Sequence, residues 1–366
     1  KKREAEALLP LGYEHLYDAL IDEYEPRATV RWLEPLVESV AQQAQEVLEA
    51  VRNSRRAPRR EILRRGFDVQ TQKAFCSKLL EWIGFDLTSG RLDESRHPFT
   101  VSFDPGDVRL TTRFANDWLS RSLFSTLHEG GHGLYEQGLP RDLVGNPAGG
   151  ALSLGIHESQ SRFWENQVGR RRAFWSFAFE PLREAFHPTL DDVSFEEFHF
   201  AINEVVASPI RTEADEVTYN LHIALRFELE KAMLEGDLAV GDAEGAWADA
   251  MEKHLGLRPE SPLEGILQDI HWSLGLFGYF VTYLLGNLYA AQWVWAMDRR
   301  LGGFDEQVAR GELAPLREWL RENVHRHGRR KTAEDLVVDA TGQPLDPQFF
   351  RGYLKRKYGA LYEVRW

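Results

Sequence analysis

Residues 31–52, RWLEPLVESVAQQAQEVLEAVR, show the pattern that runs through most of this chain. Apolar side chains recur there at intervals of three and four residues, at Leu33, Leu36, Val37, Val40, Ala41 and Ala44. That interval matches the 3.6 residues per turn of an α-helix and places the apolar side chains on one face. The stretch therefore predicts an amphipathic helix over residues 31–52.

Most of the remaining chain has the same character. Long segments without the alternation of strands are predicted as helical over residues 71–84, 117–137, 158–180, 196–207, 211–235, 243–255, 264–300 and 314–326. We find no internal repeat and no low-complexity linker between them. We therefore expect one large, mainly α-helical domain over residues 1–366.

One segment has a different pattern. Residues 99–103 (FTVSF) and 108–114 (VRLTTRF) are rich in β-branched and aromatic side chains that alternate with polar ones. The turn sequence Asp104-Pro-Gly-Asp lies between them. These features predict a β-hairpin, and so a small sheet within a helical protein.

Composition limits the class of protein. Hydrophobic residues make up 43 % and charged residues 28 % of the chain, which is typical of globular proteins. The most apolar stretch, Leu274–Leu288, is interrupted by glycines and polar residues, so it predicts a buried helix and not a membrane span. The single cysteine, Cys76, excludes an internal disulfide and a cysteine-rich zinc site, and it suits a reducing compartment, so we expect a cytoplasmic protein.

Charge argues against nucleic acid and membrane partners. The net charge is −13, which disfavours general electrostatic binding to polyanions. Seven arginines lie between Arg52 and Arg65, opposed only by Glu61. Such a run is either a polyanion patch or a solvated helix face and loop, and on an acidic chain we favour the solvated face.

The residues His128-Glu129-Gly130-Gly131-His132 form an HExxH motif. On a helix, positions i and i+4 share a face, so both imidazoles can reach one zinc ion, with Glu129 as general base. The alternative is an ordinary amphipathic helix that carries two histidines. The paired glycines weigh against it, because each costs a helix about 1 kcal/mol relative to alanine. We expect another backbone, that of the hairpin strand, to pass close to them, and the motif predicts a zinc peptidase.

A catalytic zinc needs a third protein ligand. The position six residues after His132, where the short metzincin motif has a histidine, is Gly138. Glu158 is the candidate ligand, because a second helix antiparallel to the first would return it to the metal. A carboxylate near a helix N-terminus also stabilises the helix dipole without any metal, so that alternative stays open. Glu165, two turns further on, is expected to support the site or to be structural.

Five blocks of sequence resemble the zinc carboxypeptidases typified by carboxypeptidase Taq. They occur in that family's order: DVRLTTR (107–113), HEGGH (128–132), HESQSR (157–162), IRTEAD (210–215) and GILQDIHW (265–272). The similarity extends from about Tyr17 to the C-terminal YLKRKY (353–358). The resemblance implies a mainly helical enzyme with a deep cleft, usually a homodimer, that removes C-terminal residues from peptides with broad specificity. It also implies a bound divalent metal, which we expect to be Zn²⁺, with Co²⁺ or another divalent ion as the alternative.

Carried over to this sequence, the resemblance makes His128, His132 and Glu158 the metal ligands and Glu129 the general base. These are the four residues that the motif and its spacing indicate. We expect hydrolysis by an activated water with no covalent intermediate.

The resemblance also indicates how substrate is bound. Arg211 lies in a matching block, and a planar guanidinium can bind the free carboxylate of a peptide through two hydrogen bonds. The alternative for Arg211 is an ion pair with Glu213 or Asp215.

The remaining expected site residues come from two blocks. His271 and Tyr283 are implied as donors to the developing oxyanion, whereas on their own they would be buried core side chains. Arg109 and Arg113 alternate with Leu110 and Thr112 on the hairpin strand and therefore share a face. The resemblance implies that this face meets the substrate, and the alternative is a cross-strand structural pair.

Two other functions remain open at this point. An endo-acting oligopeptidase or dipeptidase would use the same metal site in an open-ended cleft, and a non-catalytic helical protein would hold a structural metal or none. Glu129 favours an enzyme, since a structural zinc needs no base. Members of the family carry a further N-terminal helical region of about a hundred residues, and nothing in this sequence resembles it. We therefore expect a more open cleft with exposed apolar surface.

Overall fold

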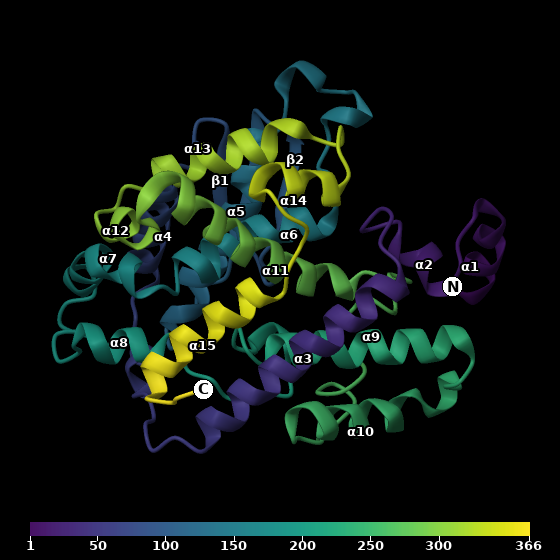
Figure 1. The fold of residues 1–366 in the computed structure, drawn as a ribbon. Helices are drawn as coiled ribbons and strands as arrows, with labels where there is room; N and C mark the ends of the chain where they lie inside the picture. The colour runs from purple at the N-terminus through teal and green to yellow at the C-terminus, as the bar shows by residue number, and fades with distance from the viewer.

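The computed structural model describes residues 1–366, and Figure 1 shows that helices make up most of it. Nine of its helices have ten or more residues: α3 (Val30–Arg52), α4 (Val69–Ile83), α5 (Leu119–Gly138), α7 (Arg172–Ala185), α9 (Tyr219–Glu235), α10 (Ala243–Leu255), α11 (Phe280–Met297), α13 (Ala314–Asn323) and α15 (Gln348–Tyr362). Shorter helices are α1 (Lys2–Leu8), α2 (Leu16–Ile21), α6 (Leu154–Arg162), α8 (Phe195–Ala201), α12 (Phe304–Ala309) and α14 (Ala333–Thr341). The expected mainly α-helical class is confirmed.

Helix α3 matches the prediction from its apolar pattern. Thr29 caps its N-terminus, since the Thr29 hydroxyl accepts a hydrogen bond from the Trp32 N–H at 3.3 Å. The predicted apolar positions face inward, and α3 packs against α9 and α15. In Figure 1 it crosses the lower half of the molecule between these two helices.

The predicted hairpin is present, in a sheet of three strands. Strands β2 (Thr100–Asp104) and β3 (Asp107–Thr112) are antiparallel, and β1 (Gly90–Glu94) pairs in parallel with β3 to give the order β1-β3-β2. Strand β1 was not predicted, because its sequence GRLDE lacks β-branched residues. Helix α5 packs against both β2 and β3, so the sheet lies beside the HExxH helix as expected.

Helix α6 lies between α5 and α11 at the centre of the molecule. The paired glycines of α5 allow this packing. A Cβ on Gly131 would lie 2.7 Å from the Ser161 Cα of α6, and one on Gly130 would meet Leu80 and Ile83 of α4. The prediction that the hairpin strand approaches these glycines is therefore wrong, since the close backbone belongs to α6. On the other side, a Cβ on Gly286 of α11 would lie 2.5 Å from the Glu158 Cγ.

Two predicted helical segments begin later than expected. In 211–235 the helix starts only at Tyr219, because the Asp215 carboxylate accepts the N–H groups of Val217 and Thr218 and turns the chain. In 264–300 the helix starts only at Phe280. Gly278, with φ +92°, lies so close to the backbone of Leu20 and Ile21 that a Cβ would be 2.8 Å away.

Two further predicted segments have different bounds. The segment 196–207 is helical only as far as Ala201 in α8. The segment 158–180 begins earlier, as α6, and passes into a π-helical turn over Phe163–Val168 before α7 starts at Arg172.

The arginine-rich stretch is tied to acidic side chains of the same chain. Arg59 pairs with Glu197 at 2.7 Å, and Arg65 pairs with Asp192 at 2.5 Å. Both arginines are therefore paired within the chain, and the expectation of a solvated face for the whole run stays a prediction. None of the helices combines the length and the apolar character that crossing a bilayer requires.

Candidate metal centre

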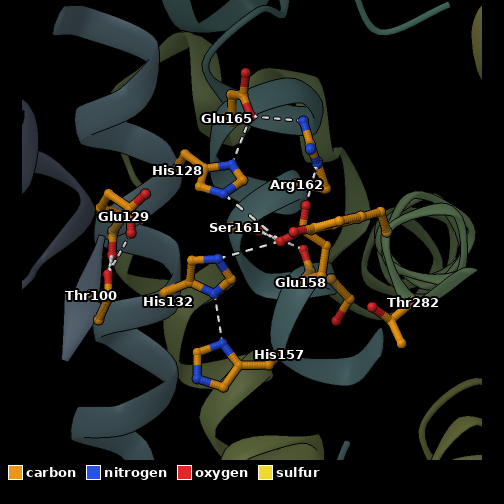
Figure 2. A network of polar contacts seen from close by, with 12 residues as sticks. Thr100, His128, Glu129, His132, His157, Glu158, Ser161, Arg162, Glu165 and Thr282 are labelled. Carbon is orange, nitrogen blue, oxygen red and sulfur yellow. Dashed lines mark hydrogen bonds and ion pairs between the residues drawn. The ribbon is translucent and has the colours of Figure 1, made fainter. Parts of the chain in front are cut away.

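His128 and His132 lie one turn apart on α5 and point toward α6 (Figure 2). The Glu158 Oε2 atom lies 3.3 Å from the His132 Nε2 and 3.8 Å from the His128 Nε2. One ligand atom from each of the three residues falls within 4.8 Å of the others. Two imidazole nitrogens and one carboxylate oxygen are a donor set that fits zinc and similar divalent ions.

Glu158 belongs to the second turn of α6, so the alternative of a carboxylate that only stabilises the helix N-terminus does not describe it. Its Oε1 accepts a hydrogen bond from the Arg162 Nε at 2.6 Å, and its Oε2 accepts one from the Ser161 hydroxyl at 3.0 Å. Burial alone would raise the pKa of Glu158, but the charges of Arg162 and His128 outweigh it and hold the pKa well below the usual range. The carboxylate is therefore ionised and oriented toward the two imidazoles.

The Nδ1 atom of each histidine, on the side of the ring away from Glu158, lies close to another side chain. The His128 Nδ1 lies 2.9 Å from the Glu165 Oε2, so Glu165 stands outside the proposed ligand set, as expected. The His132 Nδ1 lies 2.6 Å from the His157 Nδ1. Neither His157 nor its role was singled out from the sequence, although it directly precedes Glu158 in the HESQSR block.

Glu129 is buried, and it is anchored to the sheet. The Thr100 hydroxyl of β2 donates to the Glu129 Oε2 at 2.6 Å. Figure 2 shows this pair on the side of the two histidines away from Glu158. Thr100 is a contact that sequence reasoning missed, because only the packing of β2 on α5 brings it to the motif.

A second buried cluster contains Arg211. The Arg211 guanidinium binds the Asp269 Oδ1 through Nε at 3.1 Å and Nη2 at 2.6 Å. The Asp269 Oδ2 accepts two hydrogen bonds from Arg226, at 2.8 Å and 2.6 Å. Arg211 is 5 % exposed and Arg226 is 0 % exposed, so two cations and one anion are buried together.

His271 and Tyr283 lie beside this cluster. The His271 Nε2 is 3.1 Å from the Tyr283 hydroxyl, while the buried His271 Nδ1 has no hydrogen-bond partner. Burial, and then the charge of Arg211, lowers the pKa of His271 to about 4, so the imidazole is neutral near pH 7. Burial likewise raises the pKa of Tyr283 well above its usual value, so its hydroxyl keeps its hydrogen.

The two clusters are joined through Tyr219 at the start of α9. The Arg211 Nη1 donates to the Tyr219 hydroxyl at 2.9 Å, and the Arg162 guanidinium, which binds Glu158, lies 4.2 Å from the centre of the same ring. Tyr283 also lies one turn before Gly286, the residue of α11 against which Glu158 packs. The expected metal ligands and the expected Arg211, His271 and Tyr283 therefore form one contiguous polar site.

The expected partner of Arg211 is corrected. Arg211 pairs with Asp269 and not with Glu213 or Asp215; Glu213 instead binds Arg121 at 2.6 Å. Asp269 was missed because 57 residues separate it from Arg211, and only the fold of the 262–279 turns brings them together.

The arginines of the hairpin lie apart from this site. Arg109 is bound on its own strand by Asp107, at 2.7 and 2.8 Å, and its guanidinium lies 4.9 Å from the centre of the Phe103 ring of β2, as the cross-strand alternative expects. Arg113 is exposed and lies one residue beyond β3. Neither residue contacts the proposed metal ligands, and the expectation that this face meets the substrate stays a prediction.

Comparisons with known proteins identify the family of the chain. The chain matches the model of the carboxypeptidase Taq (M32) metallopeptidase family over residues 1–358. It is 47 % identical to thermostable carboxypeptidase 1 of Thermus thermophilus, over 99 % of this chain and 72 % of that protein. It is 42 % identical to carboxypeptidase 1 of Bacillus subtilis, over 96 % of this chain and 70 % of that protein. The crystal structure of the M32 carboxypeptidase from Deinococcus radiodurans is similar with a TM-score of 0.95 and 43 % identity, over 98 % of this chain and 72 % of that one. The chain therefore belongs to the carboxypeptidase Taq (M32) metallopeptidase family and is a peptide-bond hydrolase.

Proposed function

We propose that this chain is a zinc-dependent metallocarboxypeptidase that removes C-terminal residues from peptides with broad specificity. We infer cleavage at the C-terminus, and not within the peptide, from the buried cluster of Arg211, Arg226 and Asp269. In this cluster two guanidinium groups share one carboxylate. An unbalanced buried charge is costly, so an incoming anion is favoured there. The free C-terminus of a peptide supplies that anion, and an internal peptide bond does not.

Arg211 has donors left for such a ligand. A guanidinium carries five N–H hydrogens. Three are used, two by Asp269 and one by Tyr219. One hydrogen therefore remains on each terminal nitrogen of Arg211, and together they can hold a carboxylate in a fixed orientation.

The chemistry divides among the remaining residues. A divalent metal held by His128, His132 and Glu158 would acidify a water and polarise the scissile carbonyl. Glu129 takes the proton of that water and passes it to the leaving amine. His271 and Tyr283 share one hydrogen bond, so one hydrogen of the pair is left to donate to the developing oxyanion.

The test compares each peptide with its C-terminal amide. The wild type should cleave the free acid far faster, and Arg211→Met should bring the ratio of the two rates toward one while metal content stays unchanged. The expected loss on the free acid is at least ten- to a hundredfold in kcat/KM, since a charge-assisted pair contributes about 1.5–3 kcal/mol. Equal cleavage of acid and amide by the wild type would instead indicate an endo-acting oligopeptidase.

The metal is tested separately. Chelation should abolish hydrolysis, and the metal-free protein should regain activity with Zn²⁺. Recovery with Co²⁺ or Mn²⁺ but not with Zn²⁺ would overturn the choice of zinc and leave the carboxypeptidase assignment intact.

A further inference from the structure

The two histidines of the proposed metal site differ in the side chain that their Nδ1 atom contacts. His128 meets a carboxylate directly, that of Glu165. His132 meets a second imidazole, and the His157 Nε2 then lies 2.7 Å from the Glu136 Oε1. All three side chains of the His132–His157–Glu136 chain are largely buried, with 16–17 % of each exposed.

Counting hydrogens shows which atom donates and which accepts in each hydrogen bond of the His132–His157–Glu136 series. The His132 Nε2 faces Glu158, so it must offer a lone pair if a metal is to bind there. The single hydrogen of the neutral ring is then on Nδ1, and it is donated to the His157 Nδ1. The hydrogen of His157 is consequently on Nε2 and is donated to the Glu136 carboxylate, which only accepts.

The hydrogen bonds of the His132–His157–Glu136 series also link α5 and α6, the two helices that bear the proposed metal ligands. Glu136 lies one turn beyond His132 on α5, and His157 directly precedes Glu158 on α6. The His157 ring is held against the Tyr135 ring, with 5.1 Å between ring centres. A change in His157 is therefore expected to affect the position of both ligands.

We propose that His157 and Glu136 are positioning residues of the metal centre: the Glu136 carboxylate acts through His157 to hold the hydrogen of His132 on Nδ1 and so keeps Nε2 free for the metal. This inference rests on the proposed metal site and deepens it. Partners of this kind typically change metal affinity by about 10- to 100-fold when they are removed.

Two substitutions at His157 separate hydrogen bonding from packing. In His157→Gln the amide oxygen can accept from His132 and the amide nitrogen can donate to Glu136, so the direction of the chain is kept. In His157→Phe the ring volume is kept and both hydrogen bonds are lost. The readout is Zn²⁺ affinity, measured by competition with a chromophoric chelator on the full chain, together with the unfolding temperature of the metal-free protein.

We expect His157→Phe to bind Zn²⁺ about 10- to 100-fold more weakly and His157→Gln to lie within a few-fold of the wild type. The control is His254→Phe, because His254 also hydrogen-bonds a glutamate, Glu228 at 3.0 Å, away from the proposed ligands. It should leave Zn²⁺ affinity unchanged.

The opposite order, with affinity kept in His157→Phe and lost in His157→Gln, would show that the ring only packs and would overturn the inference. If His157→Phe fails to fold, Glu136→Gln is the deciding variant. It removes the negative charge that accepts the hydrogen of His157 and should weaken Zn²⁺ binding several-fold. An unchanged Zn²⁺ affinity would refute the positioning role. A wild type that binds no Zn²⁺ would overturn the proposed zinc site as well, so the two failures are distinguishable.

Discussion

The metal centre and the Arg211 cluster are built in different ways. His128, His132 and Glu158 lie on two regular helices, α5 and α6, which pack directly against each other. Arg211 and Asp269 lie on a short turn, Arg211–Glu213, and on the irregular segment before α11. The period of a helix fixes the direction of a side chain from its position in the sequence, whereas a turn takes its direction from distant contacts.

One such distant contact is Glu230 of α9. Its buried carboxylate accepts hydrogen bonds from the Tyr17 hydroxyl at 2.5 Å, the Trp272 Nε1 at 2.6 Å and the Gly278 N–H at 2.9 Å. It thereby fastens the segment that carries Asp269 and His271 to a helix and to the N-terminal part of the chain.

The largest expected effect lies within the metal centre and separates its two carboxylates. Glu129→Gln should lower kcat by about 10²- to 10⁴-fold with the metal retained, because it removes only proton transfer. Glu158→Gln should weaken metal retention, because it removes a charged ligand. Metal analysis and peptide hydrolysis on both variants check this, and equal metal loss from the two would mean that the roles are wrongly assigned.

A pH experiment addresses the other region. Burial raises the pKa of Glu230 from 4.5 to about 7, so the folded state holds this proton more tightly than the unfolded chain does. The stabilisation is complete below pH 4.5 and is lost as the pH rises to about 7. The Glu230→Gln variant should therefore gain stability relative to the wild type as the pH rises, its free energy of unfolding increasing by up to about 3 kcal/mol relative to the wild type across that range. Denaturant unfolding at several pH values measures the difference, and a constant difference would contradict it.

The comparison predicts that the two regions fail independently. Arg211→Lys should lower kcat/KM on free peptides by about ten- to a hundredfold, because a point charge does not reproduce the bidentate geometry. Metal content should not change. A fall in metal content would show that the Arg211–Tyr219–Arg162 contacts couple the regions more strongly than expected.

The smallest effect tests the packing of α5 on α6. Gly131→Ala should destabilise the fold by about 1–3 kcal/mol, since its Cβ would meet the α6 backbone. Gly245→Ala is the matched control: it lies in α10 with nothing near its Cβ and should stabilise by about 0.5–1 kcal/mol. Denaturation midpoints distinguish them, and equal stabilisation of both would mean that α6 does not lie so close.

Much of this architecture follows from local pattern. The helix over 31–52, the hairpin and the placement of Glu158 opposite the HExxH motif were all predicted, because each depends on residue periodicity or on one helix packed against another. The partner of Arg211, the late start of α11 and the anchoring of Glu129 by Thr100 were not. Each is set by segments far apart in the chain, such as Leu20 against Gly278, and no local pattern encodes such a contact.

The close packing of α6 has a consequence for how the molecule opens. With Gly131 on one side and Gly286 on the other, backbone lies nearly against backbone, so α6 cannot move away from α5 or α11 without leaving a void. Amide hydrogens of these three helices should therefore exchange with solvent only through the rarest, near-global openings. Those of residues 262–279, held chiefly by the carboxylates of Glu230 and Asp269, should exchange through local fluctuations long before.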